Sequence, residues 1–244
     1  MFSLYKKELH SFFFSPLAYI VTAIFLLIFS LTFVMGISDI SGTNDFVFSF
    51  PNIFYNNFFY FLFLIPVLTM KSFPDERKNN TEVLLISSPL SLTKIVLSKF
   101  LSVATVFAVM MLVSLVFPII TSFIGSVVWS SLISAYIGFY LWGLVCISIG
   151  IFISSFFEST ILSVIFSEAA MLLLIYIDNL ARTAYFSNLN VVSKILGFLS
   201  TSNRFIIFSQ GLFRLSDIIF YLSSTIVFTI LTIIVLEKRR WSRG

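Results

Sequence analysis

Long apolar runs separated by short clusters of charged residues dominate the pattern of this chain. The runs cover residues 11–38, 46–70, 100–157, 159–177 and 218–236, and the only charge inside them is Glu168. A helix needs about 20 predominantly apolar residues to cross the hydrocarbon core of a bilayer. Each run is therefore long enough for one crossing, and the run 100–157 is long enough for two.

A break inside the longest run separates these two crossings. The stretch "PIITSFIGSVVWSS", from Pro118 to Ser131, combines proline, glycine and serines, which interrupt helices. The pattern therefore predicts six transmembrane helices. They lie near residues 17–37, 51–70, 100–120, 132–154, 159–177 and 217–236.

The composition agrees with this pattern. Of the 244 residues, 59% are hydrophobic and 11% are charged, whereas about a quarter of the residues in a soluble domain are charged. We expect an all-α polytopic integral membrane protein with a single domain over residues 1–244. The 32 phenylalanines show no period, and we attribute them to base composition and lipid-facing surface. Cys146 is the only cysteine, which excludes an intrachain disulfide.

The first apolar run is expected to be a retained membrane anchor. It is longer than the core of a signal peptide, and no small-x-small cleavage site follows it. Residues 1–15, before the first expected span at 17–37, have the pattern of an amphipathic helix in the inner membrane interface.

The distribution of lysine and arginine predicts the orientation, because cytoplasmic loops carry the excess of these residues. With six spans, eleven of the 15 lie on the side of the two termini and four on the other side. Both termini and the loop 71–99 are therefore expected to be cytoplasmic. Residues 178–216 form an extracytoplasmic segment, in which we expect short helices with Gly211 as a stop signal.

The loop 71–99 contains the pattern of a short helix with an apolar tip. Asn79 and Glu82 have the spacing of a capping box, and Pro89 ends the helix after about two turns. The tip "VLLI", Val83–Ile86, is bordered by the charged residues 75–78. Two interpretations follow: the helix docks into a cleft of a cytoplasmic partner, or the loop is solvated and rests its apolar face on the bilayer.

A second helix is expected to follow and to lead into the third span. Ser91 is placed to cap it, and Leu92, Ile95 and Val96 share one face.

The segment "DERKNNTEVLLISSPLSLTKIVLSK" resembles the cytoplasmic loop between the second and third helices of ABC-2 type exporter permeases. In that family the loop forms the coupling helix that docks on the ATPase. The opening "LYKKELHSFFFSPLAYIVTAIFLLI" and the ending "LGFLSTSNRFIIFSQGLFRLSDIIFYLSSTIVFTILTIIVLEKRRW" resemble the gliding-motility-associated branch. The sequence departs from the family pattern at two positions. Asn80 stands where the family usually has glycine, and Glu168 adds a charge to the fifth helix.

The resemblance implies a permease subunit in the bacterial cytoplasmic membrane that works with separate ATPase subunits. The partners it implies are a cytoplasmic ABC ATPase, a second copy of this or a similar permease, and the lipid bilayer. In the gliding-motility branch, a membrane protein with a large extracytoplasmic domain is added. The resemblance places ATPase docking on eight residues: Glu76, Arg77, Thr81, Glu82, Val83, Leu84, Leu85 and Pro89.

The sequence itself argues against catalysis by this chain. It has no G-x-x-x-x-G-K-[ST] motif, so we expect no enzyme activity and no cofactor, with ATP bound by the partner. Nothing in the pattern indicates a nucleic-acid partner.

Two other function classes stay open. A carboxylate within a span is expensive and is a functional candidate, so Glu168 is compatible with an ion-coupled carrier. Alternatively, Glu168 hydrogen-bonds a serine or threonine of a neighbouring helix at a subunit interface. A non-transporting membrane scaffold is the third class.

Overall fold

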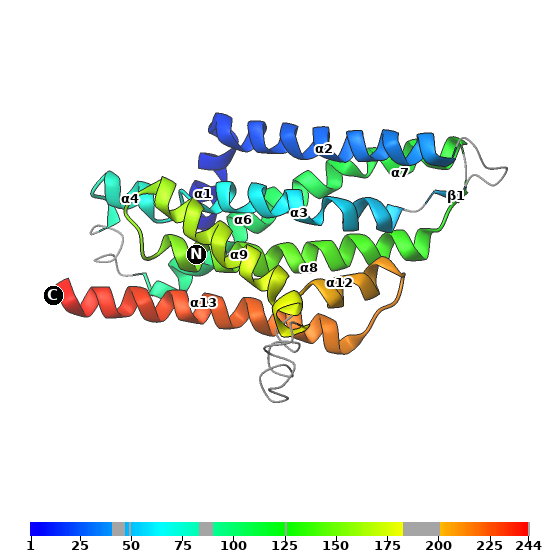
Figure 1. The fold of residues 1–244 in the computed structure, drawn as a ribbon. Helices are drawn as coiled ribbons and strands as arrows, with labels where there is room; N and C mark the ends of the chain where they lie inside the picture. Colours follow the sequence, from blue (N-terminus) through cyan, green and yellow to red (C-terminus); the bar gives the residue numbers. More distant parts are fainter. Residues whose placement is uncertain (41–46, 49, 83–89, 125, 183–200, 244) are drawn as a thin grey trace.

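The protein folds as a bundle of long helices that run along a common direction (Figure 1). The structure is a computed structural model and describes residues 1–40, 47–48, 50–82, 90–124, 126–182 and 201–243. Its helices are α1 (Phe2–Phe14), α2 (Pro16–Ile40), α3 (Phe50–Thr69), α4 (Pro74–Lys78), α6 (Leu92–Ser114), α7 (Val116–Ile124), α8 (Trp129–Ser154), α9 (Thr160–Arg182), α12 (Ser202–Ser209) and α13 (Leu215–Arg243). Two short strands, β1 (Val47–Phe48) and β2 (Ser126–Val127), pair in parallel and add a small β element to the expected all-α fold.

Five helical stretches in the described residues are long and apolar enough to cross a membrane. They are Pro16–Gly36, Ile53–Lys78, Leu92–Phe123, Trp129–Ser154 and Leu215–Trp241. Five of the expected spans are thus confirmed as helices of sufficient length, and the chain is a multi-pass membrane protein. The remaining span, 159–177, coincides with α9, in which Thr160–Leu173 forms a shorter apolar helix.

Several helix ends follow from residues that the sequence marks. Ser15 is extended and separates α1 from α2, and Pro16 occupies the first turn, where a missing N–H costs nothing. The expected break in the longest run is confirmed within Pro118–Ser131, because one apolar helical stretch ends at Phe123 and the next begins at Trp129, with β2 between them. Inside the first of these stretches, α6 changes to α7 at Leu115. Pro118, one turn later, has no N–H to donate to the carbonyl of Ser114.

Gly211 ends α12, as expected. Its φ of +81° lies in the left-handed region, which glycine adopts without strain. Its N–H donates to the carbonyl of Phe208 and the N–H of Leu212 donates to the carbonyl of Ile207, the two bonds of a Schellman motif. The apolar block 195–200, for which we also expected a helix, lies outside the described residues.

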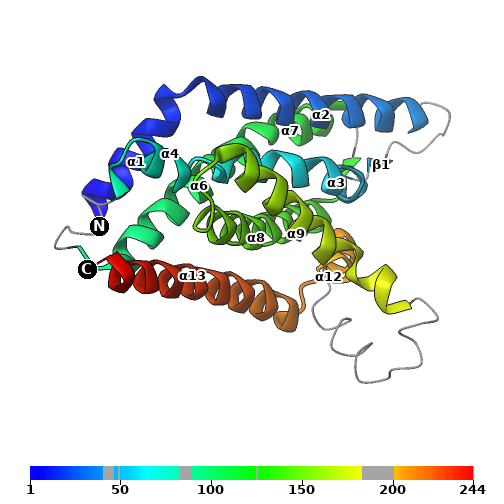
Figure 2. The ribbon, with the colours of Figure 1, turned by 60° about the vertical axis from the view of Figure 1, so that its left-hand side comes forward.

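The two ends of the bundle carry different elements (Figures 1 and 2). The elements expected on the cytoplasmic side, α4 and the C-terminal end of α13, lie at one end, and β1 and α12 lie at the other. At the second end, Arg204 of α12 pairs with the buried Asp217 of α13 at 2.7 Å. The Tyr221 hydroxyl donates to the carbonyl of Thr201 at 2.9 Å, so α12 is tied to the start of α13.

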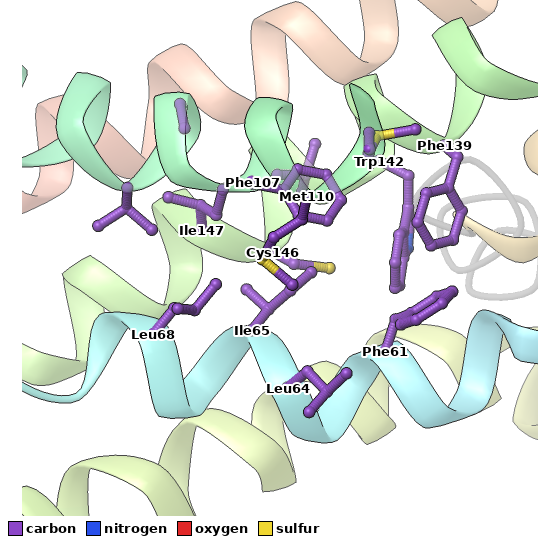
Figure 3. Packing of buried hydrophobic residues seen from close by; sticks show 14 of the residues in the cluster. Phe61, Leu64, Ile65, Leu68, Phe107, Met110, Phe139, Trp142, Cys146 and Ile147 are labelled. Carbon is purple, nitrogen blue, oxygen red and sulfur yellow. The ribbon is translucent and has the colours of Figure 1, made fainter. Parts of the chain in front are cut away.

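Helix α8 occupies the centre and packs against α3, α6, α9, α12 and α13. Figure 3 shows side chains of α3, α6 and α8 pointing toward one another, with Cys146 of α8 among them. Two glycines of α8 permit close approach, because a Cβ at Gly143 would overlap with the Phe107 ring and a Cβ at Gly150 would overlap with Thr69. Small residues at such crossings allow helices in membranes to pack closely.

Phenylalanine builds much of this core, which corrects our expectation that these residues mainly face lipid. Phe54, Phe61 and Phe139 contact one another or their neighbours at ring-centroid distances of 4.6 to 5.1 Å. Trp142 stacks its ring against Phe58 at 4.1 Å and is fully buried. Exposed phenylalanines also occur, for example Phe14 and Phe123, so the residue type serves both environments.

The contact between Gly150 and Thr69 generates a prediction. We expect Gly150→Ala to destabilise the protein by about 1–3 kcal/mol, since the added methyl group overpacks the crossing of α3 and α8. The measurement is the thermal unfolding midpoint of the detergent-solubilised protein. Thr69→Ala should relieve part of the overlap, so the double variant should lose less stability than the two single variants lose together. Strictly additive changes in the free energy of unfolding would show that the two residues do not compete for this space.

Candidate functional site

We call the end of the bundle that carries α4 the inner end, after the side of the membrane that is expected for it, and the opposite end the outer end. The inner end holds the segment that the sequence marks for docking. Proline opens this five-residue helix, acidic Asp75 and Glu76 lie in its first turn, and Arg77 and Lys78 end it. This order of charges opposes the helix dipole and stabilises a short helix. Of the charged ring that we expected around the tip, Lys78 is exposed, Asp75 and Glu76 are partly buried, and Arg77 is buried.

Arg77 is the centre of an ion cluster that fastens α4 to the rest of the bundle. Only 8% of Arg77 is exposed, and its Nε donates to Glu82 Oε1 at 3.0 Å. Its two terminal nitrogens donate to the carbonyls of Ser155 and Phe157, in the turn between α8 and α9. The guanidinium thus uses its fixed fork of donors to hold three groups at once.

Arg239 extends this cluster to the last helix. Its guanidinium lies 3.8 Å from Glu82 Oε1 and donates to the carbonyl of Phe156 at 3.0 Å. We name Arg77, Glu82 and Arg239 the Arg77 cluster. It joins the segment after α3, the turn after α8 and the end of α13, which are far apart in the sequence.

Lys99 forms a second cluster on the other side of α4. It is 2% exposed, and its ammonium donates to Glu76 at 2.8 Å and to Glu8 of α1 at 3.3 Å. The ammonium also lies 5.3 Å from the centre of the Phe73 ring, within the range of a cation–π contact. This Lys99 triad (Glu8, Glu76 and Lys99) joins α1, α4 and α6.

The turn after α4 explains one departure from the family pattern. Asn80 has a φ of +56°, in the left-handed region where glycine is most favourable and asparagine is among the best tolerated of the other residues. A position that the family usually fills with glycine is therefore compatible with asparagine.

The expected capping box differs from the structure. Asn79 lies at the C-terminal end of α4, where its N–H donates to the carbonyl of Asp75. Helical structure resumes at Glu82, whose carboxylate faces Arg77. The physical reason is that pairing with a buried guanidinium stabilises this carboxylate more than a bond to one backbone N–H.

The other predicted docking residues divide into two groups. Thr81 is exposed, and its hydroxyl donates to the carbonyl of Glu76 at 3.2 Å. Val83, Leu84, Leu85 and Pro89 lie outside the described residues. The start of the second helix of this loop is confirmed: Ser91 is the N-cap residue of α6, and Leu92, Ile95 and Val96 are buried, although the Ser91 side chain makes no capping bond.

An open groove lies beside this segment, between the start of α6 and the end of α13. It has a volume of about 560 Å³ and is lined by Leu92, Thr93, Glu237, Arg240 and Trp241, among others. Trp241 is 87% exposed. A large exposed aromatic residue beside a charged rim is typical of a protein interface.

Glu168 lies in the middle of α9, as the sequence indicates. Both oxygens of its carboxylate are buried and have no hydrogen-bond partner among the described residues. The hydroxyl oxygens of Ser163 and Ser167, on the same helix, are also buried and have no hydrogen-bond partner among the described residues. The two interpretations of Glu168, an ion relay and a contact at a subunit interface, stay predictions.

The inner end is built from ion pairs, backbone hydrogen bonds and apolar packing. In the parts of the chain that the structure describes, no group of three or more His, Cys, Asp or Glu side chains is placed to hold a metal. What the site offers is a short helix held by two buried ion clusters, next to an open groove.

The sequence contained a signal for the Lys99 triad that we did not use. The buried face formed by Leu92, Ile95 and Val96 continues at the next helical position, which is Lys99. A lysine on a core-facing stripe needs a carboxylate partner. The contacts of Glu8 with Lys99 and of Arg239 with Glu82 were not predicted, because no local sequence pattern connects these distant residues to the loop.

The Arg77 cluster generates a prediction. Glu82→Ala should destabilise the protein by about 3–5 kcal/mol, because it leaves the buried Arg77 without its carboxylate. The additional change Arg77→Met should recover part of this loss, since it removes the buried charge that Glu82→Ala leaves without its carboxylate. The measurement is the thermal unfolding midpoint. The matched control is Lys78→Ala at the exposed neighbouring residue, which should change the free energy of unfolding by no more than about 0.5 kcal/mol. Wild-type stability of Glu82→Ala would contradict the assigned role.

Comparison with known proteins gives an identity for this arrangement. A search of the curated proteins found no match. Residues 14–178 match the family described as ABC-2 family transporter protein, and this match covers more than half of the chain. It includes α4, the segment that follows it and most of the central helices. The chain therefore belongs to the ABC-2 family of transporters, as a non-catalytic transmembrane component.

Proposed function

We propose that this chain couples ATP hydrolysis by a separate ABC ATPase to movement of its own membrane helices, with the segment 76–89 as the docking element. Membership of the ABC-2 family implies an ATPase partner. The observation that carries the proposal is the fastening of α4 by the Arg77 cluster and the Lys99 triad. A segment held in this way transmits a force to four other parts of the bundle, namely α1, α6, the turn after α8 and the end of α13, instead of bending away from them.

The buried charges define a division of roles within the segment. Arg77 and Glu82 position it, because their side chains are committed to contacts within the chain. The apolar residues Val83, Leu84 and Leu85, with Thr81 before them and Pro89 after them, supply the contact with the ATPase. Trp241 and the groove between α6 and α13 are a second part of the proposed contact with the ATPase.

The membrane arrangement that this function needs has six spans and cytoplasmic termini in a bacterial inner membrane. The excess of lysine and arginine on the side of the termini supports it. The position of α4 and the C-terminal end of α13 at the same end of the bundle is compatible with it (Figure 2). The helix α9 supplies the sixth span.

The partners are an ATPase pair, a second copy of this or a similar permease and, for the gliding-motility branch, a membrane protein with a large extracytoplasmic domain. The branch rests on the opening and closing sequence blocks. The closing block lies beyond residue 178, where the family match ends.

The orientation predicts the labelling of single cysteines. In a background with Cys146→Ser, cysteines at Lys78 and Arg240 should react with a membrane-impermeant thiol reagent only from the cytoplasmic side. A cysteine at Asn188 should react only from outside. The measurement is labelling of intact cells compared with inverted membrane vesicles. Reaction of Asn188 and Arg240 from the same side would exclude the six-span arrangement.

The docking role predicts the effect of charges in the apolar tip. Leu84→Asp combined with Leu85→Asp should abolish co-purification of the ATPase, since one unpaired charge buried in a contact costs about several kcal/mol. Leu84→Met with Leu85→Met is the matched control and should retain the ATPase, because methionine keeps apolar volume. The measurements are ATPase yield and ATP hydrolysis by the reconstituted complex.

Two results would favour the other function classes. Solute transport that needs no ATPase and disappears in Glu168→Gln would identify an ion-coupled carrier. A complex that binds the ATPase at wild-type yield but shows no ATP-driven change in the accessibility of its spans would indicate a scaffold. Normal ATPase stimulation by the double aspartate variant would exclude the docking role itself.

A further inference from the structure

A polar cavity of about 260 Å³ lies between α1, the segment around α4 and α6, at the inner end of the bundle. Six of its lining side chains are charged: Lys7, Glu8, Lys71, Asp75, Glu76 and Lys99. The volume is slightly below the roughly 300–1,000 Å³ of sites for drug-sized molecules, so the cavity suits a smaller polar group.

The charges in this cavity balance, since three are positive and three are negative. The Lys99 triad forms the inner wall, with one net negative charge, and Glu76 Oε2 is buried there without a hydrogen-bond partner among the described residues. Lys7, Lys71 and Asp75 make no ion pair within the described part of the chain. They add one net positive charge near the inner wall.

The cavity combines many charged groups with an apolar border beside the expected interfacial helix. Its wall includes α1, the expected interfacial helix, and its apolar border is made by Phe12 and Leu17. Phe13 and Phe14, next to this border, are exposed. A molecule seated here therefore meets charged groups on one side and lipid-facing aromatic side chains on the other.

The geometry points to a binding site for the headgroup of a phospholipid that carries both a phosphate and a primary ammonium, as phosphatidylethanolamine does. Lys7 and Lys71 bind the phosphate, and Asp75 and Glu76 Oε2 accept hydrogen bonds from the ammonium. The acyl chains leave past Phe12 and Leu17 along the exposed face of α1. A bound headgroup links α1 to α4 in addition to the Lys99 triad.

The charge balance favours this ligand over the alternatives. Phosphatidylglycerol presents the same phosphate to the two lysines but has no ammonium to pair with Asp75 and Glu76, and inorganic phosphate adds negative charge beside these carboxylates. A trimethylated ammonium, as in phosphatidylcholine, has no N–H to donate to the carboxylates. Only a zwitterion with a primary ammonium satisfies both halves of the cavity.

The test is native mass spectrometry of the full-length protein with phosphatidylethanolamine, phosphatidylglycerol and phosphatidylcholine of identical acyl chains. We expect phosphatidylethanolamine to bind about tenfold more tightly than the other two, the effect of one charge-assisted hydrogen bond. Asp75→Asn should remove most of this preference. Lys71→Gln and Lys7→Gln should each weaken all three lipids, because they bind the phosphate.

The adjacent Lys6 provides the control, since it is exposed and does not line the cavity. Lys6→Gln should leave both affinity and preference unchanged, and an effect equal to that of Lys7→Gln would overturn the site in favour of general surface attraction. Equal binding of phosphatidylglycerol and phosphatidylethanolamine would also overturn it. Soluble phosphoethanolamine at millimolar concentration should not displace the lipid, and efficient displacement would assign the cavity to a free zwitterion instead.

Discussion

A charged side chain that leaves water has to meet an opposite charge or a set of dipoles, and at the inner end of this bundle that requirement fixes how the helices meet. Lys99 satisfies it with carboxylates from α1 and α4, and Arg77 satisfies it with Glu82 and two carbonyls after α8. Because Glu76 and Arg77 are adjacent, α4 is held on both sides. Removal of Lys99 would leave Glu8 and Glu76 without their shared cation, and removal of Arg77 would leave Glu82 with the more distant Arg239 alone in its cluster.

The middle of the bundle is held together in a different way. There the contacts are between aromatic rings and aliphatic side chains, with glycines of α8 at the closest approaches. Such packing is dense but has little directionality, whereas the ion clusters require particular partners at particular distances. The outer end again uses a directed pair, Arg204 with Asp217. The bundle thus combines two ends that carry buried ion pairs with a centre in which apolar contacts predominate over a few hydrogen bonds, such as that from Asn57 to Thr32.

The sequence predicted the long helices well, because charge is excluded from a membrane span and the gaps between charges therefore measure the spans. Gly211 marked a real helix end, and Pro118 lies beside the change from α6 to α7, since each residue acts on the backbone locally. The contacts of Lys99 with Glu8 and of Arg77 with the carbonyls of Ser155 and Phe157 were not predicted, because these partners lie many positions away in the sequence and depend on how the helices pack. The burial of many phenylalanines was missed for a related reason: an apolar ring suits lipid and protein interior equally, so composition does not distinguish the two.

The three tryptophans of the chain lie at three levels of the bundle. Trp129 begins α8 at the end that carries β2, Trp142 is enclosed by rings at the centre, and Trp241 is exposed beside the groove at the inner end. Indole emission shifts with the polarity of its surroundings, so each residue reports on a different environment. Variants that keep one tryptophan at a time would make this protein its own fluorescent sensor, able to show whether a change at the inner end reaches the core without any attached dye.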